Sequence, residues 1–256
     1  MNKEKKMIKI LYAGDFAFIN HTYVKGQNSW TSGQAFDERR FLMDTLAKDS
    51  EFDAEYLPTP YVSEKFPKTR EEISKYDVIL ISDVGTDTLL LYPDLFKIPM
   101  GENRLKLIDG FARNGGGVMA VGGWMSFGGM MGQGKYHGTL MEDIFDIDVS
   151  PFDDRVEVPE GMTFNPVVPD HPLNKDVGWE SSPLLFLGYN RFKARKQENV
   201  VSEYDGDPMM VARDYGKGRT LAFASDLAPH WGTGFVRWDN YLKFWQQCIR
   251  WLARRE

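Results

Sequence analysis

Four short apolar runs, each ending in glycine, serine or aspartate, limit the folds open to this chain. They are IKILYAGD (8–15), YDVILISDVG (76–85), GGVMAVGG (116–123) and RTLAFASD (219–226). Polar residues do not alternate regularly with apolar ones in these runs, which is typical of strands buried on both faces. Strands of that kind occur almost only in parallel sheets that carry helices on both sides.

Helical patterns lie between the runs. Residues 36–48 follow the first run, and residues 103–114 precede the third. In the second of these segments Leu105, Ile108 and Phe111 recur at helical spacing, and the Asn-Gly pair that ends it is a stop signal. Alternating strands and helices predict an α/β fold, here a flavodoxin-like parallel sheet flanked by helices.

The segment from about 146 to 218 has a different character. It contains scattered prolines, as in VEVPEGMTFNPVVPDHP, and the turn sequence YGKGR. Glycine tolerates the positive φ that tight turns between strands require. We expect an antiparallel β addition within one domain, 1–256, because no linker-like stretch separates this segment from the rest.

The chain closes with FVRWDNYLKFWQQCIRWLARRE, which we expect to form a helix packed on the sheet. Its predicted apolar face consists of Trp238, Tyr241, Leu242, Trp245, Cys248, Ile249 and Leu252. Arg250, Arg254 and Arg255 lie in the last turns, where positive charge complements the helix dipole, and we expect no catalytic role for them.

Composition excludes several classes of partner. With 31 basic and 37 acidic residues, the net charge of -6 provides no field that would attract nucleic acid or anionic lipid. The single cysteine, Cys248, allows no intramolecular disulfide, and we expect a cytoplasmic protein. Lys9 and Asp15 interrupt the apolar start, which is therefore not read as a secretory signal. The chain has no run of apolar residues long enough for a membrane span.

Ligands of open parallel sheets bind beyond the carboxyl ends of the strands, so four loops are of interest. They are 15–30, 83–88, 122–134 and 226–234. The third loop is rich in glycine, with Gly122, Gly123, Gly128, Gly129, Gly132 and Gly134. Its backbone N–H groups could be open to a carboxylate or phosphate, or the loop could be a flexible turn. The spacing matches neither a Walker loop nor a dinucleotide fingerprint, so we expect no cofactor.

Two of these loops carry a resemblance to a known family. The third apolar run leads into a turn formed by Gly122, Gly123, Trp124, Met125 and Ser126. The fourth run continues as AFASDLAPHWG, whose histidine is His230. With the aromatic final helix, this arrangement resembles the class I glutamine amidotransferase-like superfamily over nearly the whole chain. In active members a Gly-x-Cys-x-Gly turn displays a cysteine, a histidine after a late strand is its base, and a glutamate two residues on orients the histidine.

The resemblance implies a degenerate active site. Trp124 stands where the family has its cysteine, and Gly232 stands where it has the glutamate. Amide hydrolysis through a thioester needs a thiolate, and an indole offers no nucleophile. Cys248 cannot substitute, because we expect it on the apolar face of the last helix. We therefore expect no glutaminase activity from this branch of the superfamily.

A serine hydrolase is one alternative. Ser126 would be the nucleophile, His230 the base, and Asp226 or Asp83 the group that orients the base. Ser126 lies two residues beyond the crest of the turn, however, where a serine more often caps a following helix through a backbone N–H.

His230 is the stronger candidate. Pro229 stiffens its approach, Trp231 could close one wall of a pocket, and one turn of loop could bring the carboxylate of Asp226 to the imidazole. A structural role is the other interpretation. The possible metal ligands show no dense spacing of the His-x-x-x-His kind, so we expect no metal; they are His21, Asp83, His137, Asp226 and His230.

The sequence therefore favours a protein that binds a small polar molecule or a partner at the former active-site position. The predicted ligand-binding residues are Gly122, Gly123, Trp124, Asp83, Gly85, His230 and Trp231. The first alternative is a hydrolase that uses Ser126 or a water activated by His230 and Asp226. The second is a homo-oligomeric scaffold whose interface is the loop containing Met125, Met130 and Met131, since methionine suits adaptable apolar surfaces. Core packing of these side chains is the alternative, and it is favoured for Met125.

Overall fold

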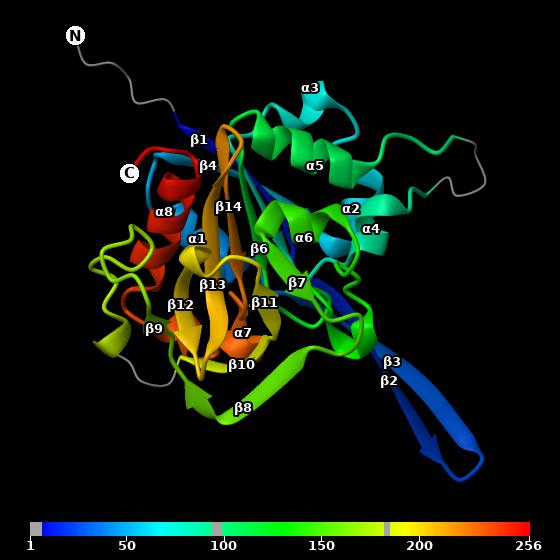
Figure 1. Ribbon diagram of the computed structural model, residues 1–256. Coiled ribbons are helices and arrows are strands. Elements are labelled where there is room, and N and C mark those ends of the chain that lie inside the picture. Colours follow the sequence, from blue (N-terminus) through cyan, green and yellow to red (C-terminus); the bar gives the residue numbers. More distant parts are fainter. Residues whose placement is uncertain (1–6, 94–98, 182–184) are drawn as a thin grey trace.

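A single mixed sheet organises the computed structural model, which describes residues 7–93, 99–181 and 185–256 (Figure 1). Its strand order is β4-β1-β5-β6-β14-β13-β12-β9. The strands are β1 Ile8–Gly14, β4 Phe52–Pro58, β5 Val78–Ser82, β6 Gly117–Val121, β9 Asn165–Pro166, β12 Val200–Tyr204, β13 Asp207–Tyr215 and β14 Gly218–Phe223. The first five in the sheet are parallel, and their order along the chain is that of flavodoxin-like folds, which confirms the predicted class.

Helices cover both faces of the parallel strands. On one face α1 packs against α8, which also contacts β6 and β14. On the other face α2 contacts α4, α4 contacts α5, and α5 contacts both α3 and α6. Their bounds are α1 Arg40–Leu46, α2 Thr59–Lys65, α3 Arg70–Ile73, α4 Thr86–Leu90, α5 Arg104–Arg113, α6 Leu140–Phe145 and α8 Tyr241–Leu252; α7 Pro229–Gly232 follows β14. None of the helices in the described residues has the length and apolar character that a membrane crossing requires.

Helix α5 forms where its sequence pattern predicts. The Asn103 side chain accepts hydrogen bonds from the backbone N–H groups of Leu105 (2.9 Å) and Lys106 (3.2 Å), which caps the first turn. Asn114 ends the helix, and Gly115 then takes a φ of +118°. The helix predicted over 36–48 is wrong at its start, because residues 36 and 37 belong to a strand and α1 begins only at Arg40.

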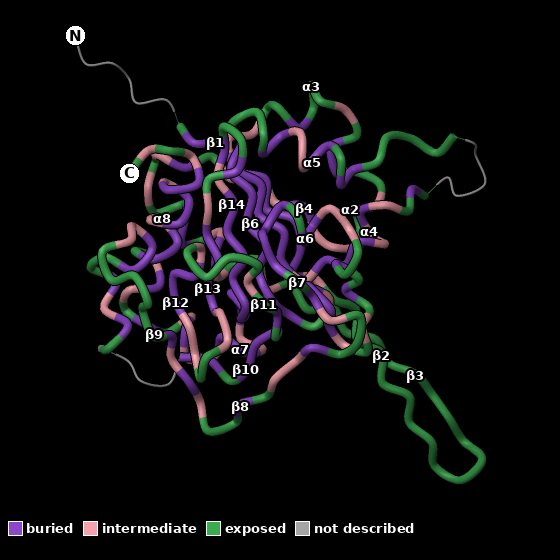
Figure 2. The backbone as a smooth tube through the Cα atoms, viewed as in Figure 1, coloured by how far each residue is buried: buried purple, intermediate pink, exposed green. Residues whose placement is uncertain are grey.

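The loop predicted over 15–30 is in fact the first strand and turn of a β-hairpin. Strands β2 Phe16–Lys25 and β3 Asn28–Asp37 pair in an unbroken antiparallel register and project away from the body (Figure 1). Gly26, with a φ of +60°, makes the turn. Nearly every residue of the hairpin is exposed (Figure 2).

The antiparallel addition is confirmed. Strands β13, β12 and β9 extend the main sheet, and Gly216 makes the predicted turn between β13 and β14 with a φ of +62°. Two small antiparallel sheets lie beside it: β7 Ile147–Val149 with β11 Phe192–Ala194, and β8 Arg155–Met162 with β10 Phe186–Asn190. Single 3-10 turns occur at Met130–Gly132, Trp179–Ser181, Gln197–Asn199 and Phe235–Arg237.

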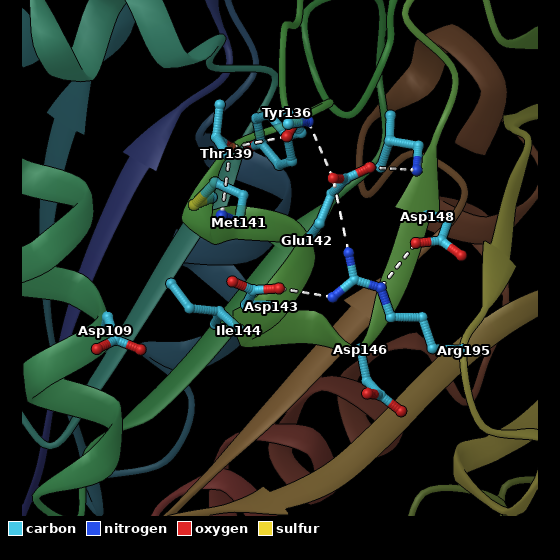
Figure 3. Close-up of polar contacts among 12 residues, drawn as sticks. Asp109, Tyr136, Thr139, Met141, Glu142, Asp143, Ile144, Asp146, Asp148 and Arg195 are labelled. Atoms are coloured by element: carbon cyan, nitrogen blue, oxygen red, sulfur yellow. Dashed lines mark hydrogen bonds and ion pairs between the residues drawn. The ribbon is translucent and has the colours of Figure 1, made fainter.

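Arg195 attaches this addition to the body. Its guanidinium lies between Asp143 of α6 (2.6 Å) and Asp148 of β7 (2.7 Å), as Figure 3 shows. Glu142 accepts the backbone N–H groups of Gly138 and Val149 in the same cluster. These contacts are charge-assisted, and they hold α6 against the small sheet.

The final helix packs on the sheet as predicted, with some differences in its buried face. Cys248 is fully buried, and Phe244 and Trp251 join the expected apolar residues. Leu242 is only partly buried, and Trp238 precedes the helix. These aromatic rings belong to a larger cluster in which Phe223 of β14 contacts Phe244 and Trp245.

Gly122, directly after β6, should be required for the packing of the sheet. A Cβ at this position would lie 2.2 Å from the backbone carbonyl oxygen of Ala224, whereas a Cβ at Gly110 in α5 would meet nothing within 4 Å. We expect Gly122→Ala to lower the free energy of unfolding by about 2–4 kcal/mol. Gly110→Ala, the matched control, should raise it by about 0.5–1 kcal/mol, because alanine favours a helix. Urea unfolding of both variants checks this; equal effects would contradict the role assigned to Gly122.

Candidate functional site

Three aspartates leave the carboxyl ends of the parallel strands and meet at one edge of the sheet. Asp15 follows β1, Asp83 follows β5, and Asp226 lies beyond β14. Asp15 and Asp83 have φ values of +45° and +53°, a region that aspartate tolerates better than most residues. The order of the parallel strands reverses between β1 and β5, which is the position where flavodoxin-like folds bind their ligands.

A cavity of about 200 Å³ lies at this position. Its wall is formed on one side by the strand ends and on the other by the base of the hairpin. The lining residues are Asp15, Phe16, Ala17, Ile19, Phe36, Glu38, Asp83, Trp124, Asp226 and His230. Four of them are acidic and none is lysine or arginine.

Two hydroxyl groups donate hydrogen bonds to the carboxyl group of Asp15. Tyr12 donates its hydroxyl to Oδ2, and Ser82 donates its hydroxyl to Oδ1 at 3.0 Å. Burial raises the pKa of Asp15 well above its usual range, and the nearby carboxyl of Asp226 raises this pKa further. These two hydrogen bonds favour the charged form, but burial outweighs them.

Asp226 contacts the histidine that follows it. Its Oδ1 accepts the backbone N–H of Ala228 at 2.9 Å, and its Oδ2 lies 3.3 Å from Nδ1 of His230. Burial, followed by the neighbouring Asp83, raises the pKa of Asp226 well above its usual range. Burial also lowers the pKa of His230. Both shifts favour a neutral pair, so this contact is not a strong ion pair.

Asp83 lies between the other two aspartates and the turn after β6. Its Oδ1 accepts the backbone N–H of Met125 at 2.5 Å. Burial raises the pKa of Asp83, and this hydrogen bond and His230 only partly offset it. Burial likewise raises the pKa of Glu38 at the rim.

Trp124 and His230 form the outer wall of the cavity. Their rings meet edge to face, with centroids 4.7 Å apart. The tryptophan side chain is 42% exposed, and the guanidinium of Arg155 lies 5.9 Å from the centre of its ring. This contact shows that the turn after β6 and the loop after β14 meet at one end of the sheet.

The match to a family model decides which proteins this chain is related to. The model described as "Putative glutamine amidotransferase" matches residues 9–254. The chain belongs to this family. None of the curated proteins matches it.

Two solved structures from the same organism are similar along their whole length. The cytoplasmic protein STM3548 of Salmonella typhimurium is 34% identical, with a TM-score of 0.89 over 96% of this chain and 99% of that one. The cytoplasmic protein STM1381 of Salmonella typhimurium LT2 is 32% identical, with a TM-score of 0.88 over the same shares. A ThuA-like protein of Bacteroides uniformis shares the fold at 12% identity, with a TM-score of 0.53 over 98% of this chain and 94% of that one.

The glycine loop of this glutamine amidotransferase-like chain is not an open anion site. Asp154 accepts the N–H groups of Gly128 (2.8 Å) and Gly129 (2.7 Å), and Asn190 accepts that of Gly123 (2.9 Å). The N–H of Gly122 donates to the carbonyl of a neighbouring strand residue at 2.8 Å. The protein's own side chains and backbone therefore accept these N–H groups, which rules out the first of the two interpretations of this loop, an open site for a carboxylate or phosphate.

Ser126 has a structural role. It is fully buried, its hydroxyl donates to the carbonyl of Val121 at 2.6 Å, and its oxygen accepts the backbone N–H of Asp83 at 3.0 Å. No helix begins at this serine, so the predicted cap of a following helix was wrong. The accepted N–H instead joins the ends of β5 and β6.

Two other predicted ligand residues lie away from the cavity wall. Trp231 is buried, and its indole N–H donates to Glu157 at 2.9 Å, so it packs behind His230 rather than lining the cavity. Gly85 lines a separate hollow near the start of α4, to which Asp83 also contributes. Asp15 and Glu38 were missed; Asp15 ends an apolar run as Asp83 and Asp226 do, whereas no sequence signal marks Glu38.

Of the five possible metal ligands, Asp83, Asp226 and His230 line the cavity, whereas His21 and His137 lie elsewhere. Within the described residues, no group of three or more His, Cys, Asp or Glu side chains is arranged to hold a metal ion. His21 lies on the exposed hairpin, and Nδ1 of His137 lies 2.8 Å from the carbonyl oxygen of Val149.

The acidic cavity predicts how stability depends on pH. An aspartate whose pKa is raised in the folded state keeps its proton there but loses it in the unfolded chain. Stability therefore falls as the pH rises above about 4, the pKa of an unfolded aspartate. Asp83→Asn keeps the acceptor for Met125 and removes a charge that raises the pKa of Asp226. We expect its free energy of unfolding to increase relative to the native protein as the pH rises from 5 to 8.

Urea unfolding across this pH range measures the difference. Asp44→Asn, on the exposed side of α1, is the control and should differ from the native protein by the same amount at every pH. A difference for Asp83→Asn that is constant or shrinks with rising pH would contradict the raised pKa values.

Proposed function

We propose that this protein binds a small polar ligand in the Asp15–Asp83–Asp226 cavity and does not release ammonia from glutamine. The observation that supports binding is the convergence of three carboxyl groups from three strand ends on one cavity with no lysine or arginine in its wall. Burying carboxyl groups without a cation costs free energy, and such perturbed groups in a cavity are typical of functional sites.

The position that the family resemblance assigns to the cysteine argues against amidotransferase chemistry. Trp124 occupies the crest of the turn after β6, and an indole cannot attack an amide carbonyl. Cys248 is the one cysteine of the chain; it is fully buried in α8, and burial raises the pKa of its thiol well above the usual range. A buried thiol with a raised pKa is not a nucleophile.

The cavity favours a ligand that donates hydrogen bonds, and above all an amine. Carboxylates accept hydrogen bonds and attract cations, while the exposed indole of Trp124 offers a face for a cation or an apolar stem. The volume of about 200 Å³ is below the range typical of drug-sized ligands, so the molecule is small. Binding of an ammonium group would replace the protons that burial holds on the aspartates.

A cytoplasmic location is part of this proposal. The two Salmonella relatives are described as cytoplasmic proteins, and the single buried cysteine suits a reducing compartment.

A hydrolase that uses an activated water is the second candidate. The separation of 3.3 Å between Asp226 Oδ2 and His230 Nδ1 is that of a base and the group that orients it, and burial favours the neutral imidazole that a base requires. Ser126 is not the nucleophile in this version, because its hydroxyl hydrogen is held by the Val121 carbonyl.

The absence of glutaminase activity can be measured directly. We expect no ammonia above the buffer blank when the protein is incubated with glutamine, and no label on Cys248 from an electrophilic glutamine analogue in the native state. In denaturant the same thiol should react with a general alkylating agent. Turnover of glutamine with stoichiometric labelling of Cys248 would contradict the proposal.

Ligand binding can be measured by thermal shift, with propylamine and propanol as a pair that differs in charge. We expect propylamine to raise the melting temperature more at pH 8 than at pH 6, and propanol to have a smaller effect, because ammonium binding competes with protons. Asp226→Asn should abolish the difference between the two probes. The control is Asp44→Asn, which should respond to both probes like the native protein. Ser126→Ala is not used as a control, because it removes two buried hydrogen bonds.

The variant His230→Ala distinguishes a role of His230 in ligand binding from a role in stabilising the fold. The imidazole is partly exposed, and its polar contact is the one with Asp226, so its loss should cost only about 1 kcal/mol. We expect the amine response to weaken with little change in melting temperature. A large loss of stability with an unchanged response would assign His230 to the framework. Loss of turnover of a nitrophenyl ester with binding retained would favour the hydrolase.

A further inference from the structure

The β2–β3 hairpin, here called the arm (residues 16–37), has no covering layer in the monomer. Its two strands pair over their full length, and apart from its base it projects beyond the body with both faces and both edges exposed (Figures 1 and 2). A two-stranded ribbon alone is only marginally stable in water, and unprotected edges tend to pair with other strands.

The exposed faces of the arm carry large apolar side chains. Tyr23 and Trp30 stack on one face with ring centroids 5.1 Å apart and are 44% and 48% exposed. By the register of the strands, Phe18 and Val24 lie on the opposite face, and they are 67% and 71% exposed. Tyrosine and tryptophan are the residues most enriched at the centres of protein interfaces.

The face that carries Tyr23 and Trp30 supplies part of the area that a stable interface needs. Ile19 and Phe36 lie on the same face and are each 38% exposed. With side-chain areas of roughly 150–250 Å², these four side chains expose on the order of 300 Å², against about 800 Å² per partner in a typical interface. The serine, threonine and asparagine residues of the arm supply polar surface that would complete it.

The net charge of the arm indicates which kind of partner it would bind. Apart from His21, its only ionisable side chains of basic or acidic type are Lys25 and Asp37, so it is neutral, while the chain as a whole carries -6. A basic partner would favour an acidic arm, and nucleic acid would favour a basic one. A second copy of this chain is itself acidic, and a neutral apolar arm is the surface on which two such copies meet without like-charge repulsion.

We propose that the arm is an interface with a second copy of this chain, anchored by the Tyr23–Trp30 face. The same face continues toward the body as Ala17, Ile19 and Phe36, which line the cavity. A copy seated on the arm therefore lies beside the cavity, and assembly and ligand binding share one sheet face.

Sedimentation velocity over a range of protein concentrations tests this without any ligand. We expect the native protein to form a dimer or larger assembly at micromolar concentration. The double variant Tyr23→Ser, Trp30→Ser should raise the dissociation constant at least a hundredfold. Phe152→Ser, which removes an exposed aromatic ring (74% exposed) from the body, is the matched control and should assemble like the native protein.

A second variant guards against misfolding of the arm. Replacing residues 21–32 with an Asn-Gly turn between Asn20 and Gly33 shortens the arm and keeps the paired residues that line the cavity. It should be monomeric with an unchanged melting transition of the body. Three results would each overturn the proposal. The native protein could remain monomeric even at 100 times the micromolar concentrations named above, or both arm variants could still assemble. Phe152→Ser could also weaken assembly as much as the arm variants do.

Discussion

Two buried aspartates, Asp15 and Asp226, and the partly buried Asp83 meet at one edge of the sheet with no lysine or arginine in the cavity wall, and this is the constraint on which the site depends. Burial raises the pKa of all three, and for Asp15 and Asp226 the neighbouring carboxyl groups add to the effect. Hydrogen bonds from Tyr12 and Ser82 reduce this cost but do not remove it. A chain selected for stability alone would replace such groups, so their presence supports a ligand that uses them.

The fold brings these carboxyl groups together through backbone approach rather than through side-chain packing. Gly14 has a φ of +141°, and a Cβ there would lie 1.8 Å from the carbonyl oxygen of Ser82, so β1 and β5 can end this close only with glycine. Further along the edge, Ser126 joins β5 to β6, and Asp154 fills the glycine loop. Internal donors and acceptors thus hold in place the loops that surround the cavity.

Much of this could be predicted from the sequence, because strand burial and helix caps are local patterns. The four apolar runs identified β1, β5, β6 and β14 but not the fifth parallel strand, β4, and the spacing of Leu105, Ile108 and Phe111 identified α5. The hairpin was missed because its apolar residues lie on both faces and do not alternate with polar ones. The partners of Ser126 and the glycine N–H groups could not be predicted, because Asp83, Asp154 and Asn190 are far away in sequence. Asp15 and Glu38 could not be assigned to the site from the sequence, because the base of the hairpin forms one wall of the cavity that they line.

The most direct test is an NMR pH titration of the native protein. The side-chain carboxyl ¹³C resonances of Asp15, Asp83 and Asp226 report the protonation of each aspartate. The account predicts that at least Asp15 and Asp226 remain protonated well above pH 4 in the free protein and lose their protons when propylamine is added. If all three aspartates titrate together near pH 4 and do not respond to the amine, the cavity is not an uncompensated acidic site and the account is wrong.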